Sequence, residues 1–494
     1  MKYTELARKN RRTTETDNNS NKNGNNYKND NDLEKEKNKR NDSVGESITL
    51  NSPSSLSSSS SSKDKAQSKP VENVLILQGG GSLGAFGCGV FKALAKKNIK
   101  IDIIAGTSIG AVNAAIIAGS KDGKPSEQLL EEFWVELSNS FVDLNNYGYS
   151  PLLSYLYIPG LSEQLKYSQD SNYPYSVTAR KPLTEEAGEP EGQREEAEHP
   201  HHHHRFLSAN EKARKMKQLM SFYSSAVFGN DKMFKPRWKP EYAVSDPEYF
   251  TPEKWTYLYD HSPLATTLDK YIDYDKLNPG GKSNARLIIS ATNVLTAEPL
   301  VFDSSKEQIT PKHILAASGY PLYNFPWIEV KKGIYAWDGS LLSNTPLREA
   351  IDASPVNDKR IFLVENYPRN IDVLPRTLPE VHHRARDIMF SDKTGHNVTM
   401  AKVITRYLEY IEELYQMLEL HADHKQIGEE RLKRIRQKYK KYKQERGAEI
   451  KKIFYISRDE PFPHIYENAD FSPETIKNSI QEGERKTIQA LRRM

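Results

Sequence analysis

From Val71 onward, the hydrophobic and polar positions alternate between the pattern of a β-strand and that of an α-helix. The segment "VENVLILQGGGSLGAFGCGVFKALAKKN" (71–98) contains an apolar strand, a glycine turn and a helix, and "IKIDIIAGTSIGAVNAAIIAG" (99–119) repeats that order. Parallel neighbouring strands cannot be joined by a tight hairpin, so two such units in a row predict parallel strands connected by helices. The expected fold class is α/β, with a mainly parallel sheet and helices packed on it.

The same patterns continue towards the C-terminus. Apolar runs bounded by turn residues predict strands at 285–294, 299–303, 360–367 and 452–458. Helices are expected at 311–319 and 346–352 and in a long tract after Leu378, followed by a basic helix and, from Ser472, a closing helix. Between 124 and 275, residues rich in Tyr, Trp and Pro predict helices and loops that cover a pocket. The aromatic segments 221–238 and 248–260 fit an apolar channel or interfacial rim as well as they fit core packing.

Composition indicates that part of the chain does not fold. The hydrophobic content is 37% and the mean hydropathy is −0.74. Residues 1–70 are almost entirely polar and predict a disordered tail, and the polar tract Thr178–Arg205 predicts a disordered insertion at about 169–212. The folded parts are then a domain at 71–355 and a mostly helical extension at 356–494 with one late strand.

Charge and cysteine content exclude several classes of site. The 70 basic and 66 acidic residues nearly balance, so no nucleic-acid partner is expected. The basic run Lys433–Arg446 fits an anionic surface, but a solvated helix face is the preferred interpretation. The four histidines His201 to His204 are interpreted as a solvated run, and no metal site is expected. The single Cys88 excludes an intrachain disulfide and a multi-cysteine zinc site, and its surroundings predict a small buried helix residue.

No stretch of the sequence approaches the 18 or so apolar residues that would span a bilayer, and the N-terminus lacks an apolar signal region. The sequence therefore predicts a protein of the cytoplasm or one attached peripherally to a membrane. It leaves secretion as an effector open.

The first chemical candidate is Ser108. Gly106, Ser108 and Gly110 form G-x-S-x-G between a predicted strand and a predicted helix, the context in which this motif raises a nucleophilic serine above a sheet. The helix N-terminus favours negative charge that develops there. We interpret Ser108 as a nucleophile in preference to a helix-capping serine.

The upstream glycine turn has two interpretations. Gly79, Gly81 and Gly84 form G-x-G-x-x-G, which is typical of dinucleotide-binding folds, but the acidic residue that would hold a ribose is misplaced, since Asp102 begins the second strand. In the alternative, the backbone amides of Gly79, Gly80 and Gly81 form an oxyanion hole for a substrate bound to Ser108.

A serine nucleophile needs a base. His382, His396 and His464 occur late enough in the chain for the usual order serine, acid, histidine, but none follows a strand in a short loop. Asp338 does, because it comes after the apolar "IYAW" and before Gly339. A partly buried carboxylate in contact with the hydroxyl can serve as the base, although an Asp-Gly pair alone is usually a plain turn.

Together these motifs resemble the patatin-like phospholipase family. "GGGSLG" is similar to its oxyanion motif, "GTSIG" to its nucleophile motif and "DGS" to its third motif, in the family's order. "SATNVLTAEPLVF", "ILAASGYPLYNFP" and "SNTPL" extend the resemblance over Val71–Ala350. "RARDIMFSDKT" and "DFSPETI" resemble the C-terminal extension of a bacterial branch.

The resemblance implies a three-layer fold and a Ser108–Asp338 dyad without histidine. It also implies that Gly79, Gly80 and Gly81 are the oxyanion donors, supported by Gly84, Gly106, Gly110 and Gly339. No cofactor or metal is implied, and the expected partner is membrane or micellar phospholipid. Two positions depart from the family pattern: Leu83 stands where many members carry Arg or Lys, and Ser340 stands where glycine or alanine is commoner.

The expected function is therefore a lipid acyl-ester hydrolase of the phospholipase A or lysophospholipase type. The alternative is a catalytically silent lipid-binding or scaffold protein on the same fold, and a nucleotide-binding oxidoreductase ranks third. The sequence leaves open the headgroup and acyl-chain preference, acyl transfer in place of hydrolysis, the need for an activating partner and the oligomeric state.

Overall fold

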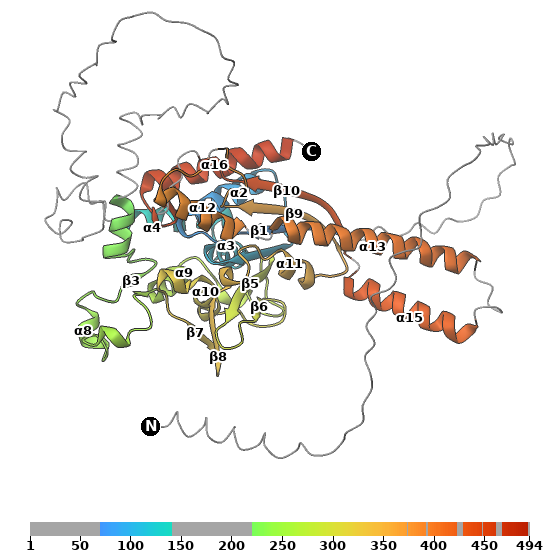
Figure 1. Ribbon diagram of the computed structural model, residues 1–494, viewed down its shortest axis with the longest axis horizontal. Coiled ribbons are helices and arrows are strands. Elements are labelled where there is room, and N and C mark those ends of the chain that lie inside the picture. The colour runs from blue at the N-terminus through green and yellow to red at the C-terminus, as the bar shows by residue number, and fades with distance from the viewer. Residues whose placement is uncertain are drawn as a thin grey trace, which may run out of the picture. The chain divides into compact units, whose positions relative to one another are not determined.

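The structure is a computed structural model that describes residues 70–140, 220–372, 374–391, 394–421, 428–446, 448–460 and 467–492 (Figure 1). All of these lie in one compact unit, Gln67–Met494. Residues 1–69 of the predicted tail, the predicted insertion with His201 to His204, and His464 lie outside the described residues.

An eight-stranded sheet forms the centre of this unit. Its strands follow the order β10 (Ile450–Ser457), β9 (Asp358–Glu365), β1 (Val71–Leu77), β2 (Ile103–Thr107), β5 (Arg286–Asn293), β8 (Ile334–Asp338) and β7 (Ile328–Lys331), and β6 (Pro299–Asp303) also pairs with β5. Neighbouring strands from β10 to β5 are parallel, whereas β6 and β8 run antiparallel to β5 and β7 runs antiparallel to β8. The predicted mainly parallel sheet is confirmed, with an antiparallel part on one side.

Helices cover both faces of the sheet because its central strands are apolar on both sides. On β1, Leu75 and Leu77 pack into one core cluster with α2 (Gly84–Lys96), α3 (Ile109–Ala118), α4 (Ser126–Asn139) and α16 (Pro473–Arg492). Val74 and Ile76 point the other way and pack with α11 (Leu347–Ala353) and the start of α13 (Thr394–His421). Alternate residues of one strand therefore hold two helical layers.

The C-terminal part of the chain completes this core. β10 adds a strand beside β9, and α16 lies across α2 (Figure 1). The two helices cross at glycines: a Cβ atom at Gly89 would be 1.9 Å from the Ile480 carbonyl oxygen, and one at Gly483 would be 2.1 Å from that of Phe86. The predicted extension therefore belongs to the same compact unit as the predicted domain at 71–355.

The other labelled helices are α8 (Tyr242–Ser245), α9 (Ser262–Leu268), α10 (Pro311–Ser318), α12 (Leu378–Ser391) and α15 (Glu429–Arg446), and residues 220–228 are also helical. A short antiparallel pair, β3 (Lys235–Pro236) and β4 (Tyr259–Asp260), lies apart from the main sheet. Short 3-10 turns complete the set: η1 (Gly81–Leu83), η3 (Pro252–Lys254), η4 (Tyr274–Lys276), η5 (Pro321–Tyr323), η6 (Gly339–Leu341) and η7 (Glu467–Ala469).

Most expected elements are confirmed within a few residues, and two differences stand out. The long helical tract after Leu378 is two helices, α12 and α13, and the strand β7 was not expected. Cys88 is a fully buried residue of α2, as predicted. Within the described ranges, no helix combines the length and the apolar run needed to cross a bilayer.

Candidate active site

Ser108 occupies a strained turn between β2 and α3. Its backbone has φ 55° and ψ −131°, a conformation that a non-glycine residue rarely adopts. The flanking glycines make the turn feasible: a Cβ atom at Gly106 would be 2.2 Å from the Gly110 carbonyl oxygen, and one at Gly110 would be 2.3 Å from that of Leu77. The predicted strand–serine–helix elbow is present, and Ser108 is half-buried at its apex.

Strand β5 brings Asp338 to the same level as Ser108. β2 and β8 pair one after the other with the same side of β5, because β6 pairs with its other side: Thr107 pairs with Ser290, and Asp338 pairs with the next residue, Ala291. Because β2 runs parallel to β5, Ser108 follows at the level of Ala291. The order of strands therefore places two residues that are distant in sequence at one edge of the sheet, and both line one cavity.

Asp338 is completely buried at the end of β8. Its Oδ1 accepts a hydrogen bond from the Ser340 backbone amide at 2.8 Å, while Oδ2 meets no hydrogen-bond partner among the described residues. Burial raises the pKa of Asp338 to about 6, although hydrogen bonding by Ser108 and Ser340 acts in the opposite direction. Burial thus gives this carboxyl a proton affinity suited to a general base near neutral pH.

The Ser108 hydroxyl is close enough to lower the pKa of Asp338, but it does not satisfy Oδ2 with the geometry of a full hydrogen bond. Catalytic hydrogen bonds are commonly long or poorly aligned without substrate and tighten in the complex. The unpaired Oδ2 leaves an acceptor available for the serine proton.

The glycine turn after β1 lies directly beside Ser108. Gly80 and Gly81 line the cavity, and both have positive φ, 150° and 58°. Gly79 does not line it, and its amide donates to Asn344 Oδ1 at 3.0 Å. A Cβ atom at Gly79 would be 2.7 Å from the Ser108 Cβ atom. Of the three expected donors, the structure therefore leaves Gly80 and Gly81 facing the cavity and commits the Gly79 amide to Asn344.

The supporting glycines allow close packing around these motifs. A Cβ atom at Gly84 would be 2.8 Å from the Ile109 side chain, where α2 meets α3. One at Gly339 would be 2.6 Å from the Ser290 carbonyl oxygen, where the turn after Asp338 passes β5. Both positions need a residue without a side chain.

Asn344 connects the glycine turn to the turn that follows Asp338. Its Oδ1 accepts hydrogen bonds from the Gly79 amide and the Ser340 hydroxyl, both at 3.0 Å, and its Nδ2 donates to the Phe390 carbonyl of α12 at 3.2 Å. Asn344 also lines the cavity. The sequence analysis named it only within "SNTPL" and assigned it no role, because its contacts with Gly79 and Phe390 are long-range.

The cavity beside Ser108 has a volume of about 480 Å³ and a mostly apolar wall. Phe234 and Tyr259, from the two expected aromatic segments, line it and also pack edge to face with each other, at 5.5 Å between ring centroids. The channel and core interpretations of these segments therefore both hold at this point. Leu322 and Met389 line the cavity and remain exposed at its rim.

The C-terminal part of the chain supplies a further wall that sequence reasoning did not anticipate. Arg386 and Phe390 from α12, and Asn468 from η7, line the cavity. Leu83, at the position where the family often has a cation, is buried with Phe390 and Tyr367. Arg386 lies over the Tyr367 ring at 5.3 Å from its centroid, so a guanidinium from α12 reaches the neighbourhood of Leu83.

The histidines considered as bases do not lie in the cavity as far as they are described. His382 is exposed on α12, the side chain of His396 is not described, and His464 lies outside the described residues. A fourth histidine, His261, does line the cavity; its Nε2 is 2.9 Å from the Leu315 carbonyl oxygen and its Nδ1 has no partner among the described residues. Burial lowers the pKa of His261. It precedes α9 rather than following a main-sheet strand, so its place in the sequence did not single it out.

One cluster within the described residues has the side chains of a metal site, with potential ligand atoms within 4.8 Å of one another: His383, Asp387, Glu460 and Glu467. Two guanidinium groups already hold these carboxylates. Arg386 donates to Asp387 and Glu467, and Arg458 donates to Glu460 and Glu467, at 2.8 to 2.9 Å. Since each carboxylate already accepts a hydrogen bond from a guanidinium group through one of its oxygens, we interpret the cluster as a buried ion-pair network.

Comparison with known proteins identifies the family, but the match to a curated relative spans only a small part of that protein. The family model described as patatin-like phospholipase matches residues 75–351, more than half of the chain. Lysophospholipase nte1 of Aspergillus terreus is 53% identical over 51 residues, which span 10% of this chain and only 3% of that protein.

Two solved structures are similar at low identity. VipD from Legionella pneumophila is 15% identical, with a TM-score of 0.32 and coverage of 85% of this chain and 66% of that chain. The type III effector ExoU of Pseudomonas aeruginosa is 11% identical, with a TM-score of 0.26 and coverage of 86% and 54%. At these TM-scores neither likeness bears on the details of the site.

Proposed function

Because this chain belongs to the patatin-like phospholipase family, we propose that it is a serine hydrolase that cleaves acyl esters of lipids, of the phospholipase A or lysophospholipase type. The observation that carries the proposal is the placement of Ser108 and Asp338 at one level on the same side of β5, in one apolar cavity. A nucleophile, a carboxylate of raised pKa and a lipid-sized apolar space are the requirements of the reaction.

In the proposed reaction, Asp338 accepts the Ser108 proton as Oγ attacks the ester carbonyl carbon. The tetrahedral intermediate collapses, and Asp338 returns the proton to the departing alcohol oxygen, which leaves an acyl ester on Ser108. Asp338 then takes a proton from a water molecule, the resulting hydroxide attacks the acyl carbonyl, and the fatty acid leaves as Ser108 regains its proton. This scheme needs no cofactor.

The backbone amides of Gly80 and Gly81 would stabilise the oxyanion. Both residues line the cavity beside Ser108 and adjoin the N-terminus of α2, where backbone N–H groups lack helical partners. One such donor contributes roughly 3 to 4 kcal/mol to the transition state in other serine hydrolases. Gly79 has a different role in this proposal, because its amide binds Asn344 and thereby holds the glycine turn in position.

A membrane or micellar phospholipid is the proposed substrate. The cavity wall is mostly apolar and accommodates an acyl chain, and the exposed Leu322, Tyr323 and Met389 at its rim offer contact with a lipid aggregate. In this proposal the protein works at a lipid surface, to which it binds peripherally.

The test compares wild-type protein with Ser108→Ala, Asp338→Asn and the control Ser318→Ala. Ser318 also lines the cavity, but its hydroxyl donates to the Ile314 carbonyl oxygen of its own helix at 2.9 Å. Each protein is assayed for fatty acid release from mixed phospholipid vesicles and for covalent labelling by a fluorophosphonate.

We expect release and labelling by wild-type protein and Ser318→Ala, no release or labelling by Ser108→Ala, and loss of release by Asp338→Asn. Labelling without release would support Ser108 as the nucleophile and contradict phospholipid as the substrate. If folded wild-type protein showed neither, even with cell extract added, the proposal would fail in favour of a lipid-binding or scaffold role.

A further inference from the structure

The helices α13 and α15 carry a surface that the proposed active site does not use. Along α13, Met400, Ile404, Tyr407, Ile411 and Leu414 form what we name the apolar stripe, with side chains 36% to 65% exposed. Their spacing of four, three, four and three residues places them on one face of the helix. An unbroken row of large exposed apolar side chains of this kind marks a contact surface.

The helix α15 covers a different face of α13. Tyr415 stacks on Tyr439 with 3.8 Å between ring centroids, Arg436 donates to Glu419 at 2.7 and 2.8 Å, and Glu412 accepts from Tyr439 and Lys443. These contacts use positions 412, 415 and 419 of α13, which form their own row beside the stripe. Pairing of the two helices therefore leaves the apolar stripe exposed.

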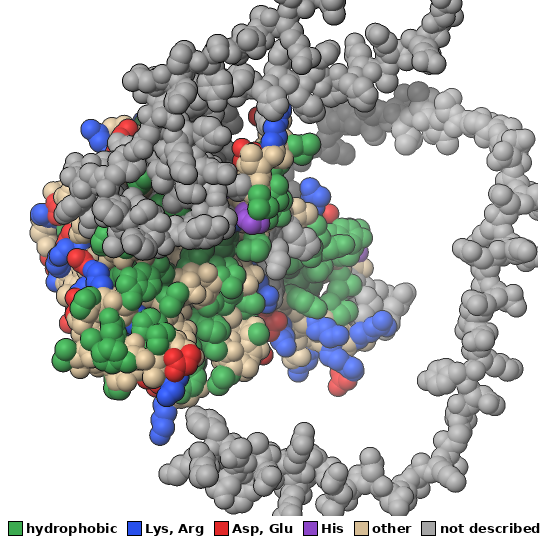
Figure 2. All heavy atoms as spheres, turned by 60° about the vertical axis from the view of Figure 1, so that its left-hand side comes forward, with side chains coloured by type: hydrophobic (Ala, Val, Ile, Leu, Met, Phe, Trp, Pro, Cys, Tyr) green, Lys and Arg blue, Asp and Glu red, His purple; other side chains and the backbone are tan. Residues whose placement is uncertain are grey.

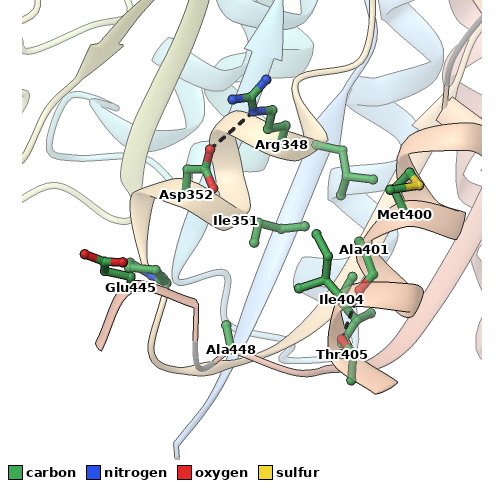
Figure 3. A pocket seen from close by; sticks show the side chains of 12 residues that line it. Arg348, Ile351, Asp352, Met400, Ala401, Ile404, Thr405, Glu445 and Ala448 are labelled. Carbon is green, nitrogen blue, oxygen red and sulfur yellow. Dashed lines mark hydrogen bonds and ion pairs between the residues drawn. The ribbon is translucent and has the colours of Figure 1, made fainter. Parts of the chain in front are cut away.

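The stripe continues into a groove where α13 meets the body of the molecule. This groove has a volume of about 330 Å³ and lies between α11, α13 and the start of β10. Figure 3 shows Ile351 of α11 facing Ile404 of α13 across it, with Met400 and Ala401 beside them. The apolar surface therefore extends from the exposed length of α13 into the groove.

The helix α15 adds positive charge next to this surface. It has nine lysines and arginines against three glutamates. Arg431, Lys433, Lys438 and Lys440 are exposed and form no ion pair within the described part of the chain, whereas Arg434, Arg436, Lys441 and Lys443 do. In Figure 2, hydrophobic side chains gather on the helix pair at the right of the molecule, above Lys and Arg side chains.

We propose that the α13–α15 pair docks on an anionic lipid bilayer, with the apolar stripe at the acyl-chain boundary and the α15 cations at the lipid phosphates. An amphipathic helix flanked by cations binds such an interface in two ways: its apolar face is buried among the acyl chains, and its cations are attracted to the anionic headgroups. A solvated basic face, which the sequence alone favoured, does not explain the stripe. A second copy of the chain would bring like charges together, and a nucleic acid would leave the stripe in water.

This docking would give the proposed hydrolase access to aggregated substrate, and only that consequence rests on the proposed function. Vesicle binding itself requires neither Ser108 nor Asp338, so the two proposals can fail separately.

The test measures co-sedimentation of the full-length chain with two kinds of vesicle: phosphatidylcholine alone, and phosphatidylcholine with about 30% phosphatidylserine. Leu414→Glu disrupts the stripe, and its control Leu295→Glu makes the same change at a 70% exposed leucine elsewhere. The triple variant Lys433→Gln, Lys438→Gln, Lys440→Gln removes α15 charge. Its control changes the exposed Lys254, Lys282 and Lys332 to Gln, which alters net charge equally.

We expect wild-type protein to bind the anionic vesicles at least about tenfold more tightly than the neutral ones, and the Leu414 and triple variants each to lose about tenfold, with both controls unchanged. Hydrolysis of a short soluble ester should be the same in all five proteins. Equal binding to both vesicles, or test variants that bind like their controls, would overturn the proposal.

A change of oligomeric state in Leu414→Glu, measured by size-exclusion chromatography with light scattering, would also overturn it, because the stripe would then be an interface between copies. If wild-type protein binds vesicles but hydrolyses neither lipid nor soluble ester, the proposed function fails and the docking surface stands. If it hydrolyses the soluble ester but binds no vesicle, only the docking surface fails.

Discussion

The carbonyl oxygen of Asn468 lies where a side chain at Gly81 would begin, since a Cβ atom there would be 2.2 Å from that oxygen. The neighbouring Ser82 hydroxyl donates to the Glu467 carbonyl at 2.8 Å. The turn η7, near the end of the chain, therefore fixes the glycine turn that faces Ser108. The C-terminal part of the molecule is thus a component of the candidate site.

Gly81→Ala is expected to lower kcat by about a hundredfold or more, because the displaced turn would misplace an oxyanion donor. The positive φ of Gly81 adds backbone strain to the collision with Asn468. Steady-state kinetics on a soluble ester test this. The control is Gly333→Ala, which has a similar φ of 78° but open space around it. Equal effects of the two substitutions would contradict the role assigned to Gly81.

The activity should follow the ionisation of Asp338. Its pKa is raised to about 6, and only the carboxylate form accepts the Ser108 proton, so kcat/KM should rise with pH through about 6 and then level off. A pH profile with a soluble ester measures this limb. An ascending limb centred well above 7 would point to a different base.

Asp338→Asn should abolish activity yet stabilise the fold at pH 8. A pKa raised from 3.8 to about 6 means that the folded protein binds this proton more tightly than the unfolded chain. The ionised buried carboxylate then costs about 3 kcal/mol above pH 6, and the cost vanishes as the pH falls below about 4. Thermal unfolding at pH 8 and at pH 4 tests whether Asp338→Asn raises the stability at the higher pH only. Glu253→Gln, at an exposed position, is the control. A lower Tm for Asp338→Asn at pH 8 would show that its charge is compensated in the fold.

His261→Phe should keep kcat within about tenfold of wild type, whereas Asp338→Asn should not. His261 lines the cavity, but its Nε2 contacts the Leu315 carbonyl and its ring packs on Phe325, which suits a structural side chain. The substitution keeps the ring and loses one hydrogen bond, at about 1 kcal/mol of stability. Single-turnover acylation of both variants decides whether Asp338 or His261 is the base. Loss of acylation in His261→Phe but not in Asp338→Asn would make His261 the base.

Chelation of divalent metal ions with EDTA is expected to leave fatty acid release unchanged. The proposed steps use Ser108, Asp338 and backbone amides, and the carboxylates of the His383 cluster are held by Arg386 and Arg458. The assay uses a monomeric ester, so that an effect of metal ions on vesicles does not enter. Loss of activity that returns with added metal ion would overturn the ion-pair interpretation of the cluster.

The sequence by itself determined the local features of this protein. Strand, glycine turn and helix succeed one another within short windows of sequence, and the elbow at Ser108 lies between β2 and α3 where its pattern predicted it. Asp338 could be singled out because an apolar strand and a glycine flank it. Periodicity and turn chemistry are properties of neighbouring residues, so these features can be read without knowing the fold.

Only the tertiary structure decided which side chains meet. The strand register puts β2 and β8 in succession along the same side of β5 and so brings Asp338 level with Ser108. Long-range contacts bind the Gly79 amide to Asn344, place His261 in the cavity and bring Asn468 against Gly81. A hydrogen bond or a steric contact depends on positions in space that residues distant in sequence reach only when the whole sheet and its two helical layers assemble.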